Sequence, residues 1–298
     1  MKKGRGRGCG GFSSATRGLP VNDSKFQIPN RSPEAPPIGE VEGKGRAIEA
    51  MFDRIAPRYD LLNRVLSFGV DRWWRRRAIR ALRRALPEGR APERLLDAAT
   101  GTADLAIRAA ETFLGAEVTG VDLAENMLRR GRAKARQRGL GGRVRLDRGD
   151  ATDLSFADDA FDGAFVAFGV RNYEDLGAGL RELRRVLRPG GAVVVLEFSR
   201  PRAPVFRSLY DVYARHVLPR IGRLVSGDAG AYRYLPASVR AFPDGPAFLR
   251  RMRRAGFRRA RWRPLFPFGI ASLYVGLVGE PSGGASGARP PRRSAARG

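Results

Sequence analysis

Short apolar segments alternate with longer amphipathic segments along most of the chain, and this alternation limits the possible folds more than any other feature. Strand-like segments occupy residues 94–98, 117–122, 143–148, 161–167 and 192–198, with a late pair near 261–264 and 272–278. Helix-like segments occupy residues 46–86, 103–112, 124–138 and 175–187. This order is typical of α/β proteins in which helices cover both faces of a parallel sheet. We therefore predict seven mostly parallel strands, preceded by a helical N-terminal region.

Size and composition set further limits. The 298 residues fit one large domain or two small ones, and 43% apolar residues suffice for a sizeable core. Cys9 is the only cysteine and His216 the only histidine, so the sequence excludes a disulfide scaffold and a Cys/His zinc cluster. We expect no metal. No run of 18 apolar residues occurs, and no apolar segment follows the basic start. A cytoplasmic protein is the expectation.

The two ends of the chain differ in composition from the rest. Residues 1–44 and 281–298 are rich in Gly, Pro, Ser and Arg and show no periodicity. We predict two disordered basic extensions around one domain at residues 45–280. The chain holds 56 lysines and arginines against 30 acids, a formal net charge of +26. Such a charge favours anionic neighbours: nucleic acid, anionic lipid surfaces or phosphate-bearing ligands.

The turn after the first strand has the features of a nucleoside-binding loop in a Rossmann-like sheet. It starts at Asp97 and passes through Gly101, and its small residues let a ligand approach the following helix N-terminus. Asp122 ends the second strand, where a carboxylate accepts both hydroxyls of a ribose. Asp150 and Ala151 follow the third strand, where an acid would contact an adenine amino group. The alternative is that Gly101 only makes a tight turn and Asp122 only caps the next helix.

The glycine spacing discriminates between nucleoside cofactors. A pyrophosphate cofactor such as NAD needs G-x-G-x-x-G, whereas Gly101 is followed here by Thr102 and Ala103. A Leu-Arg-Pro-Gly-Gly segment at 187–191 precedes the fifth strand. Together with the strand-end carboxylates, this set resembles the class I S-adenosylmethionine-dependent methyltransferases. That family usually has glycine at the positions of Ala99 and Ala103, where this chain keeps small side chains.

Longer stretches narrow the resemblance. They read MFDRIAPRYDLLN at 51–63, SFG at 67–69, DRWW at 71–74, FGVRN at 168–172 and RVLRPGG at 185–191, and LEFS follows at 196–199. These stretches closely resemble the C-methyltransferases of menaquinone and ubiquinone biosynthesis, over roughly residues 45–279. That family commonly has histidine where Asp71 stands and lysine where Arg188 stands. Because the first departure removes any imidazole chemistry, we assign Asp71 no catalytic role.

The resemblance implies a reaction and a set of cofactor contacts. The reaction is methyl transfer from S-adenosyl-L-methionine to a ring carbon of a prenylated hydroquinone. We favour conversion of demethylmenaquinol to menaquinol, and a ubiquinone-precursor benzoquinol remains the alternative. The contacts carried over by position are Thr102 at the turn, Asp122 on the ribose, and Asp150 with Ala151 near the adenine. Asp97 and Gly101 complete the predicted cofactor site.

The chemistry of methyl transfer suggests candidate catalytic residues. A methyl sulfonium is already electrophilic, so the protein must align the reactants, exclude water and make the ring carbon nucleophilic. We assign Arg171 to stabilising a phenolate, Asn172 to orienting a hydroxyl, and Tyr59, in the helical N-terminal region, to closing over the ring as part of a lid. The alternatives are a solvated or salt-bridged turn residue for Arg171 and core packing for Tyr59. Spacing alone identifies no general base.

A prenylated substrate implies contact with a bilayer. Residues 205–225 mix Leu, Val, Tyr and Phe with Arg at near-helical spacing, interrupted by Pro219. Such a face would favour anionic headgroups, which predicts peripheral association with the inner face of the cell membrane. The alternative is that this helix packs on the sheet with its arginines in solvent. The sequence gives no oligomeric state.

The charge of +26 also invites a rival interpretation as a nucleic-acid-binding or RNA-modifying protein. The segment after the fourth strand lacks the D/N-P-P-Y motif of amino-methylating enzymes, and Cys9 in the N-terminal extension cannot serve cytosine-C5 chemistry. Aromatic residues do not interleave with the basic runs as stacking platforms would. We therefore expect no specific nucleic-acid partner. A small-molecule methyltransferase with another phenolic acceptor is the third alternative.

Overall fold

The computed structural model describes residues 36–38, 43–67, 69–213, 216, 220 and 229–279. Most of the predicted extensions at 1–44 and 281–298 lie outside these residues, as does much of the predicted amphipathic stretch beyond Tyr213. Lys44, the last residue of the predicted N-terminal extension, is buried and begins the first helix.

Seven strands form one sheet in the order β3-β2-β1-β4-β5-β7-β6. The strands are β1 (Arg94–Ala98), β2 (Glu117–Asp122), β3 (Val144–Arg148), β4 (Phe161–Ala167), β5 (Leu187–Phe198), β6 (Arg258–Leu265) and β7 (Ala271–Leu277). β1 to β5 pair in parallel, and β7 runs antiparallel to both β5 and β6. The predicted seven-stranded, mostly parallel sheet is confirmed.

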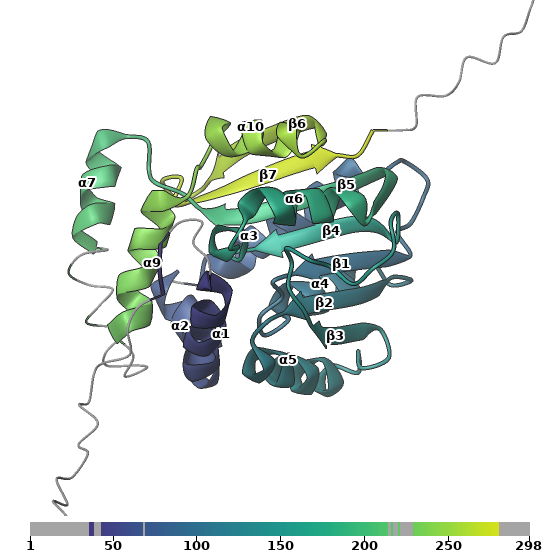
Figure 1. Cartoon of the computed structure of the whole chain (residues 1–298), viewed down its shortest axis with the longest axis horizontal. Coiled ribbons are helices and arrows are strands. Elements are labelled where there is room, and N and C mark those ends of the chain that lie inside the picture. The colour runs from purple at the N-terminus through teal and green to yellow at the C-terminus, as the bar shows by residue number, and fades with distance from the viewer. Residues whose placement is uncertain are drawn as a thin grey trace, which may run out of the picture. The chain divides into compact units, whose positions relative to one another are not determined.

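The helical N-terminal region consists of α1 (Lys44–Ile55), the short 3-10 turn η1 (Ala56–Arg58), α2 (Tyr59–Leu66) and α3 (Asp71–Ala85). Between and after the strands lie α4 (Asp104–Thr112), α5 (Glu125–Gln137), η2 (Val170–Asn172), α6 (Leu176–Arg185), α7 (Pro204–Val212), α9 (Ala229–Ala241) and α10 (Pro246–Arg254). In Figure 1, α1, α2 and α9 lie beside the end of the sheet toward which β4 points.

One predicted boundary is wrong. The sequence placed the end of a helix at Pro189-Gly190-Gly191 and the start of the fifth strand at Ala192, whereas β5 already begins at Leu187. Phe161 pairs with Leu187 and Gly163 pairs with Ala192, so the register shifts across the glycines. Strand pairing therefore extends past a segment whose composition is typical of a break, because a bulge absorbs the extra residues.

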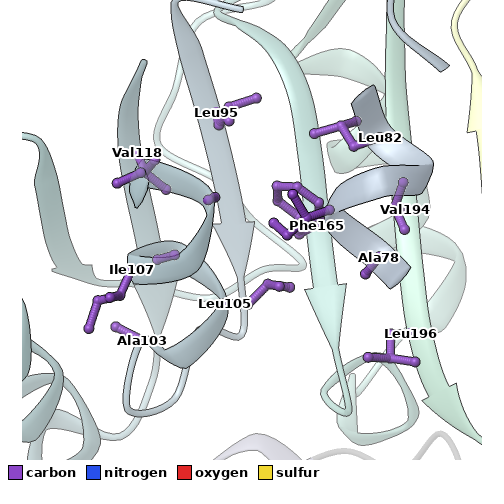
Figure 2. Close-up of a cluster of buried hydrophobic side chains, with 14 of the residues drawn as sticks. Ala78, Leu82, Leu95, Ala103, Leu105, Ile107, Val118, Phe165, Val194 and Leu196 are labelled. Atoms are coloured by element: carbon purple, nitrogen blue, oxygen red, sulfur yellow. The ribbon is translucent and has the colours of Figure 1, made fainter. Parts of the chain in front are cut away.

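Helices pack on both faces of the sheet and bury two apolar clusters. α3, α4 and α5 cover one face with residues such as Leu82, Leu105 and Leu128. Figure 2 shows Ala78 and Leu82 of α3 lying near Phe165 and Val194 of the central strands. α6 and α10 cover the other face. Because both faces are buried, β4 and β5 are almost continuously apolar, as expected for central parallel strands.

The strand order reverses at β1, which pairs with β2 on one side and β4 on the other. Ligands of open α/β sheets bind beyond the carboxyl ends of the strands at such a point. We therefore expect the ligand site at the turns after β1, β2, β3 and β4. None of the described helices is long and apolar enough to cross a membrane.

Candidate active site

The turn between β1 and α4 is a tight loop with an unusual backbone. Ala99, Gly101 and Ala103 have φ values of 56°, 57° and 63°, in the left-handed region that favours glycine. Two of the three residues are alanines, so the loop carries local strain of a kind that concentrates at functional sites. A Cβ on Gly101 would meet only the Tyr59 ring, at 3.9 Å, so the loop leaves open space above its glycine.

Asp97 holds this turn from below. Its Oδ2 accepts hydrogen bonds from Thr100 Oγ1 at 2.7 Å and from the Ala106 N–H at 3.0 Å. Its Oδ1 is buried and has no hydrogen-bond partner among the described residues. Burial raises the pKa of Asp97 from the usual 3.8 to about 7. An unpaired buried oxygen is costly, so Asp97 is kept in this position at an energetic cost.

Asp122 joins the end of β2 to the same turn. Its Oδ2 accepts the Gly101 N–H at 2.8 Å and its Oδ1 accepts the Ala124 N–H at 3.0 Å. Burial raises the pKa of this carboxyl above its usual value. After β3, Asp150 Oδ1 accepts hydrogen bonds from the Thr152 N–H and Oγ1, both at 2.8 Å. Two carboxylates thus stand in fixed orientations at neighbouring strand ends.

These turns surround a cavity of about 720 Å³, a volume that includes the open space at its mouth. Six of the residues predicted from the sequence line it: Tyr59, Gly101, Asp122, Asp150, Ala151 and Asn172. The other three, Asp97, Thr102 and Arg171, are not among its lining residues. Asp97 lies beneath the turn. Thr102 donates from Oγ1 to Asp60 Oδ1 at 2.5 Å and so ties the turn to α2.

The N-terminal helices form the opposite wall of this cavity, here called the cofactor cavity. Ile48 and Phe52 of α1 line it together with Tyr59, whose ring meets Phe52 edge-on at 5.8 Å. Glu174 anchors the start of α1 by accepting the N–H groups of Gly43 and Gly45 at 2.8 and 2.9 Å. The predicted helical region therefore lies over the turns at the strand ends.

Arg171 is buried and already paired. Its Nη1 contacts Glu197 Oε1 at 2.8 Å and also donates to the carbonyl oxygen of Phe168, and its Nε donates to Ser238 Oγ at 3.3 Å. The Arg171 side chain is 6% exposed and that of Glu197 is fully buried. This is the salt-bridged alternative from the sequence. Asn172, by contrast, lines the cofactor cavity, and its Oδ1 accepts the Tyr234 hydroxyl at 3.1 Å.

A second cavity, which the sequence did not predict, encloses about 1310 Å³. We call it the apolar cavity. Its lining comes from α2, α3, α7, α9 and the turns around them, and includes Trp74, Phe168, Phe198, Phe206, Leu209, Tyr210, Leu235, Phe268 and Ile270. No motif links these positions along the chain. The only available signal was the clustering of aromatic residues in the stretches that carry the resemblance.

Phe168 separates the two cavities, because it lines both of them. It is 6% exposed, has a left-handed backbone with φ of 60°, and packs on Phe198 with ring centroids 4.4 Å apart. A smaller cavity lies against the same ring, and it also includes Tyr59 and Asn63. A ligand in the cofactor cavity and one in the apolar cavity would therefore meet at Phe168.

The fold and the cofactor cavity together define a class of protein. Strand order 3-2-1-4-5-7-6 with an antiparallel β7, and a glycine turn facing a strand-end carboxylate, are the features of class I S-adenosylmethionine-dependent methyltransferases. The lining fits that cofactor: carboxylates at Asp122 and Asp150 and small residues at Gly101 and Ala151 suit a nucleoside that carries a positive charge.

Comparison with known sequences gives the family. The model of the ubiE/COQ5 methyltransferase family matches residues 40–278, and the chain belongs to this family. A demethylmenaquinone methyltransferase of Deinococcus radiodurans is 49% identical over 241 residues, 81% of this chain and 96% of that protein. The ubiquinone/menaquinone biosynthesis C-methyltransferase UbiE of Syntrophotalea carbinolica is 50% identical over 80% and 96% of the two chains. S-adenosyl-L-methionine is accordingly the methyl donor.

A solved structure agrees at the level of the fold. A SAM-dependent methyltransferase of Thermotoga maritima, described as a possible histamine N-methyltransferase, superposes with a TM-score of 0.50. It shares 19% sequence identity, and the match covers 76% of this chain and 98% of that one. At this identity the likeness concerns the sheet and its helices, and it says nothing about the methyl acceptor.

Proposed function

We propose that this protein transfers the methyl group of S-adenosylmethionine to a ring carbon of demethylmenaquinol. The observation that carries the proposal is the apolar cavity of about 1310 Å³, open space at its mouth included, which shares Phe168 with the cofactor cavity. Its mostly aromatic and aliphatic wall suits a bicyclic ring with a prenyl tail, since burial of apolar surface is the main source of affinity for such a ligand. The names of the related proteins support the same acceptor.

The chain's own residues contribute binding, alignment and exclusion of water. Gly101, Asp122, Asp150 and Ala151 hold the cofactor, while Asp97 and Thr102 act through the turn they fix. Tyr59 covers the reacting groups from α2, and Asn172 orients a ring hydroxyl from the edge of the cofactor cavity. We assign Arg171 a positioning role through Phe168, because its charge is paired with Glu197 and its Nη1 holds the Phe168 carbonyl.

An assay with radiolabelled S-adenosylmethionine tests this function. Purified protein receives, anaerobically and in separate reactions, demethylmenaquinol, a ubiquinone-precursor benzoquinol, and total RNA. We expect label in the naphthoquinol product, with a lower rate for the benzoquinol and none in RNA. Faster transfer to the benzoquinol would move the protein to ubiquinone biosynthesis. Transfer to RNA alone would refute the quinol assignment.

We also propose that the protein docks on the surface of an anionic bilayer, the inner face of the cell membrane. α7 has no buried residues, and Val205, Leu209 and Val212 are 69%, 62% and 57% exposed. Phe266 and Phe268, in the turn before β7, are 73% and 53% exposed. We call these five side chains the docking surface, and two of them, Leu209 and Phe268, also line the apolar cavity. A lipid-dissolved quinol would enter there, and the net charge of +26 favours anionic headgroups.

Flotation with vesicles tests the docking surface. We expect wild-type protein to float with vesicles containing anionic phosphatidylglycerol at low salt, less at high salt, and little with neutral phosphatidylcholine vesicles. The double variant Val205→Ser/Val212→Ser should float several-fold less. Leu114→Ser is the matched control, because Leu114 is 76% exposed but lies between α4 and β2. Equal flotation of all three proteins would exclude α7 as the membrane contact.

A further inference from the structure

The apolar cavity contains one pair of opposite charges. Among its described lining residues, Asp71 carries the only carboxylate and Arg75 the only cation. Each residue is 7% exposed, and both belong to α3, Asp71 in its first turn. Burying an ion pair in an apolar surface costs desolvation energy, and hydrophobic residues of the same volume often serve stability equally well. The pair therefore calls for an explanation beyond stability.

The hydrogen bonds of the pair fix the orientation of the carboxylate. Asp71 Oδ2 forms an ion pair with Arg75 Nη1 one helical turn later. Asp71 Oδ1 accepts a hydrogen bond from Ser67 Oγ at 3.0 Å, and Ser67 also lines the cavity. Each carboxylate oxygen offers two acceptor positions. The fixed carboxylate thus retains capacity for a hydroxyl of a ligand in the cavity.

The pair lies close to the wall between the two cavities. The Arg75 guanidinium lies over the ring of Phe168, 5.6 Å from its centroid. Burial raises the pKa values of Tyr59 and Asp97, and the positive charge of Arg75 opposes that rise in both. Arg75 therefore acts electrostatically on the cofactor side as well as on the apolar side. The position matches the place where a quinol ring would face the methyl donor.

We propose that Asp71 is the general base of the reaction and that Arg75 stabilises the resulting ring oxyanion, an inference that rests on the proposed quinol methylation. Arg171 does not line the apolar cavity, and Glu197 and the Phe168 carbonyl bind its guanidinium. The other titratable groups facing the apolar cavity are Tyr210, on α7, and Tyr213, just after it. Burial raises the pKa of both tyrosines, to about 12 for Tyr210, so they remain neutral hydroxyls.

The step balances without a further reactant. Asp71 takes the proton of a ring hydroxyl, and the oxygen's electron pair makes the adjacent ring carbon nucleophilic. That carbon forms a bond to the methyl carbon as the carbon–sulfur bond breaks, and the sulfur keeps the electron pair as a neutral thioether. The ring carbon then loses its hydrogen as a proton to water, and Asp71 returns its proton to the ring oxygen. One methyl group is transferred and one proton is released.

The variant Asp71→Asn tests this role in the full-length protein. We expect kcat for demethylmenaquinol to fall by about 100-fold or more, the usual contribution of a general base. The Kd for S-adenosylmethionine should stay within about twofold, since Asp71 does not line the cofactor cavity. The variant's rate should rise about tenfold per pH unit between about pH 7 and 9, because solvent ionisation of a phenol near pH 10 replaces the lost base. Wild-type activity should change little over the same range.

Asp162→Asn is the matched control. Asp162 is also 7% exposed and is bound by Arg188 at 2.8 Å, but it lies at the start of β4 and lines neither cavity. The activity of the Asp162→Asn variant should fall only in proportion to any loss of folded protein. If Asp71→Asn does not fold, Asp71→Asn/Arg75→Met removes both charges and leaves no unpaired ion. Because it also removes the group that stabilises the oxyanion, its loss of kcat should be at least as large, and its rate should still rise with pH.

Two results would overturn the proposal for Asp71. One is kcat within about threefold of wild type. The other is a large loss with a pH profile parallel to that of wild type, which would indicate a structural role. Either result, with wild-type protein active on the quinol, leaves the proposed function standing. Failure of the wild-type protein to methylate the quinol, with normal S-adenosylmethionine binding, would instead refute the proposed function itself.

Discussion

The cofactor cavity and the apolar cavity meet at one phenylalanine but are built in different ways. The cofactor cavity is made by turns that directly follow β1, β2, β3 and β4, so short stretches of sequence specify most of its wall. The apolar cavity draws on positions from Asn63 to Ile270, brought together by the packing of four helices against the end of β5 and several turns. Local backbone geometry creates the first cavity, and tertiary assembly creates the second.

The two cavities also differ in how their acidic groups are held. Asp97 beneath the cofactor turn and Asp122 in its wall are carboxyl groups whose pKa values burial raises. Among the described residues that line the apolar cavity, the one carboxylate is Asp71, which forms an ion pair with Arg75. A ligand in the cofactor cavity thus meets the Asp122 carboxyl, whereas a quinol in the apolar cavity meets a preformed ion pair.

The largest effect that we expect concerns Asp97 and pH. In the folded chain its pKa is about 7 instead of 3.8, so the native state holds this proton more tightly than the unfolded state. The contribution of Asp97 to the free energy of unfolding is therefore complete below pH 3.8 and is lost as the pH rises through 7. The loss amounts to about 4 kcal/mol. In Asp97→Asn this decline should be absent.

Urea unfolding of wild type and Asp97→Asn at pH 5, 6, 7 and 8 measures the difference. The free energy of unfolding of the variant, relative to that of wild type, should increase as the pH rises to about 7. Above pH 7 the difference between the two proteins should stay constant. Asp162→Asn is the control. Although burial opposes it, hydrogen bonds and Arg188 lower the pKa of Asp162 below its usual 3.8, so this carboxyl is ionised in both the folded and the unfolded chain from pH 5 to 8. Its gap from wild type should therefore stay constant across this range. A constant gap for Asp97→Asn across this range would contradict the assignment.

The second prediction tests how tightly the local turns define the cofactor cavity. A Cβ on Gly169 would lie 2.4 Å from the Ala99 Cβ, and both residues line that cavity. Gly169→Ala must push apart the turns after β1 and β4. We expect S-adenosylmethionine affinity to fall about 100-fold, or about 3 kcal/mol, at the upper end of overpacking effects.

Calorimetric titration gives the affinities, and the structure supplies both a control and a rescue. Gly115→Ala should bind normally, because a Cβ there meets no atom within 4 Å. Adding Ala99→Gly to Gly169→Ala removes the clashing methyl and also relieves the left-handed backbone of Ala99. The double variant should recover most of the affinity. Failure of the double variant to recover affinity would show that contact between Ala99 and residue 169 is not the cause of the loss.

The fold and the cofactor cavity were largely predictable for the same physical reason. Strand ends such as Asp97 and Asp122 are visible in a sequence because a buried apolar run stops at a carboxylate, and parallel strands bring their carboxyl ends to one edge. The β5 boundary was wrong because the pairing of Phe161 with Leu187 is a long-range contact that outweighs the local Pro-Gly-Gly signal.

The apolar cavity and the burial of Arg171 were not predictable in this way. Arg171, in the turn η2, is paired with Glu197, 26 positions later on β5. Asp71 was set aside because its residue type differs from that common in related proteins, whereas its importance comes from which cavity its side chain lines. Residue type and spacing predict local backbone geometry, but they do not predict which side chains from distant parts of the chain line the same cavity.

A third prediction tests whether a change in the cofactor cavity leaves binding in the apolar cavity unaffected. Asp122→Asn keeps the size of the side chain but removes a charged acceptor that holds the Gly101 N–H at 2.8 Å. Hydrogen bonds to charged groups contribute about 1.5–3 kcal/mol, so S-adenosylmethionine affinity should fall by about 10-fold to 100-fold. KM for the quinol should stay within about twofold. The surface variant Asp147→Asn, which affects only an exposed pair with Arg145, should match wild type in both measurements.

The smallest effect belongs to the mouth of the apolar cavity. Phe206 on α7 stacks on Phe268 with ring centroids 4.2 Å apart, and both line the cavity while 37% and 53% exposed. Phe206→Ala should raise KM for a long-chain prenyl quinol about five- to tenfold, near 1 kcal/mol, in detergent micelles. A quinol with a truncated chain should show little change, because its tail ends before the rings. Leu114→Ala should leave both KM values unchanged, and an equal rise for both quinols in Phe206→Ala would place the prenyl tail elsewhere.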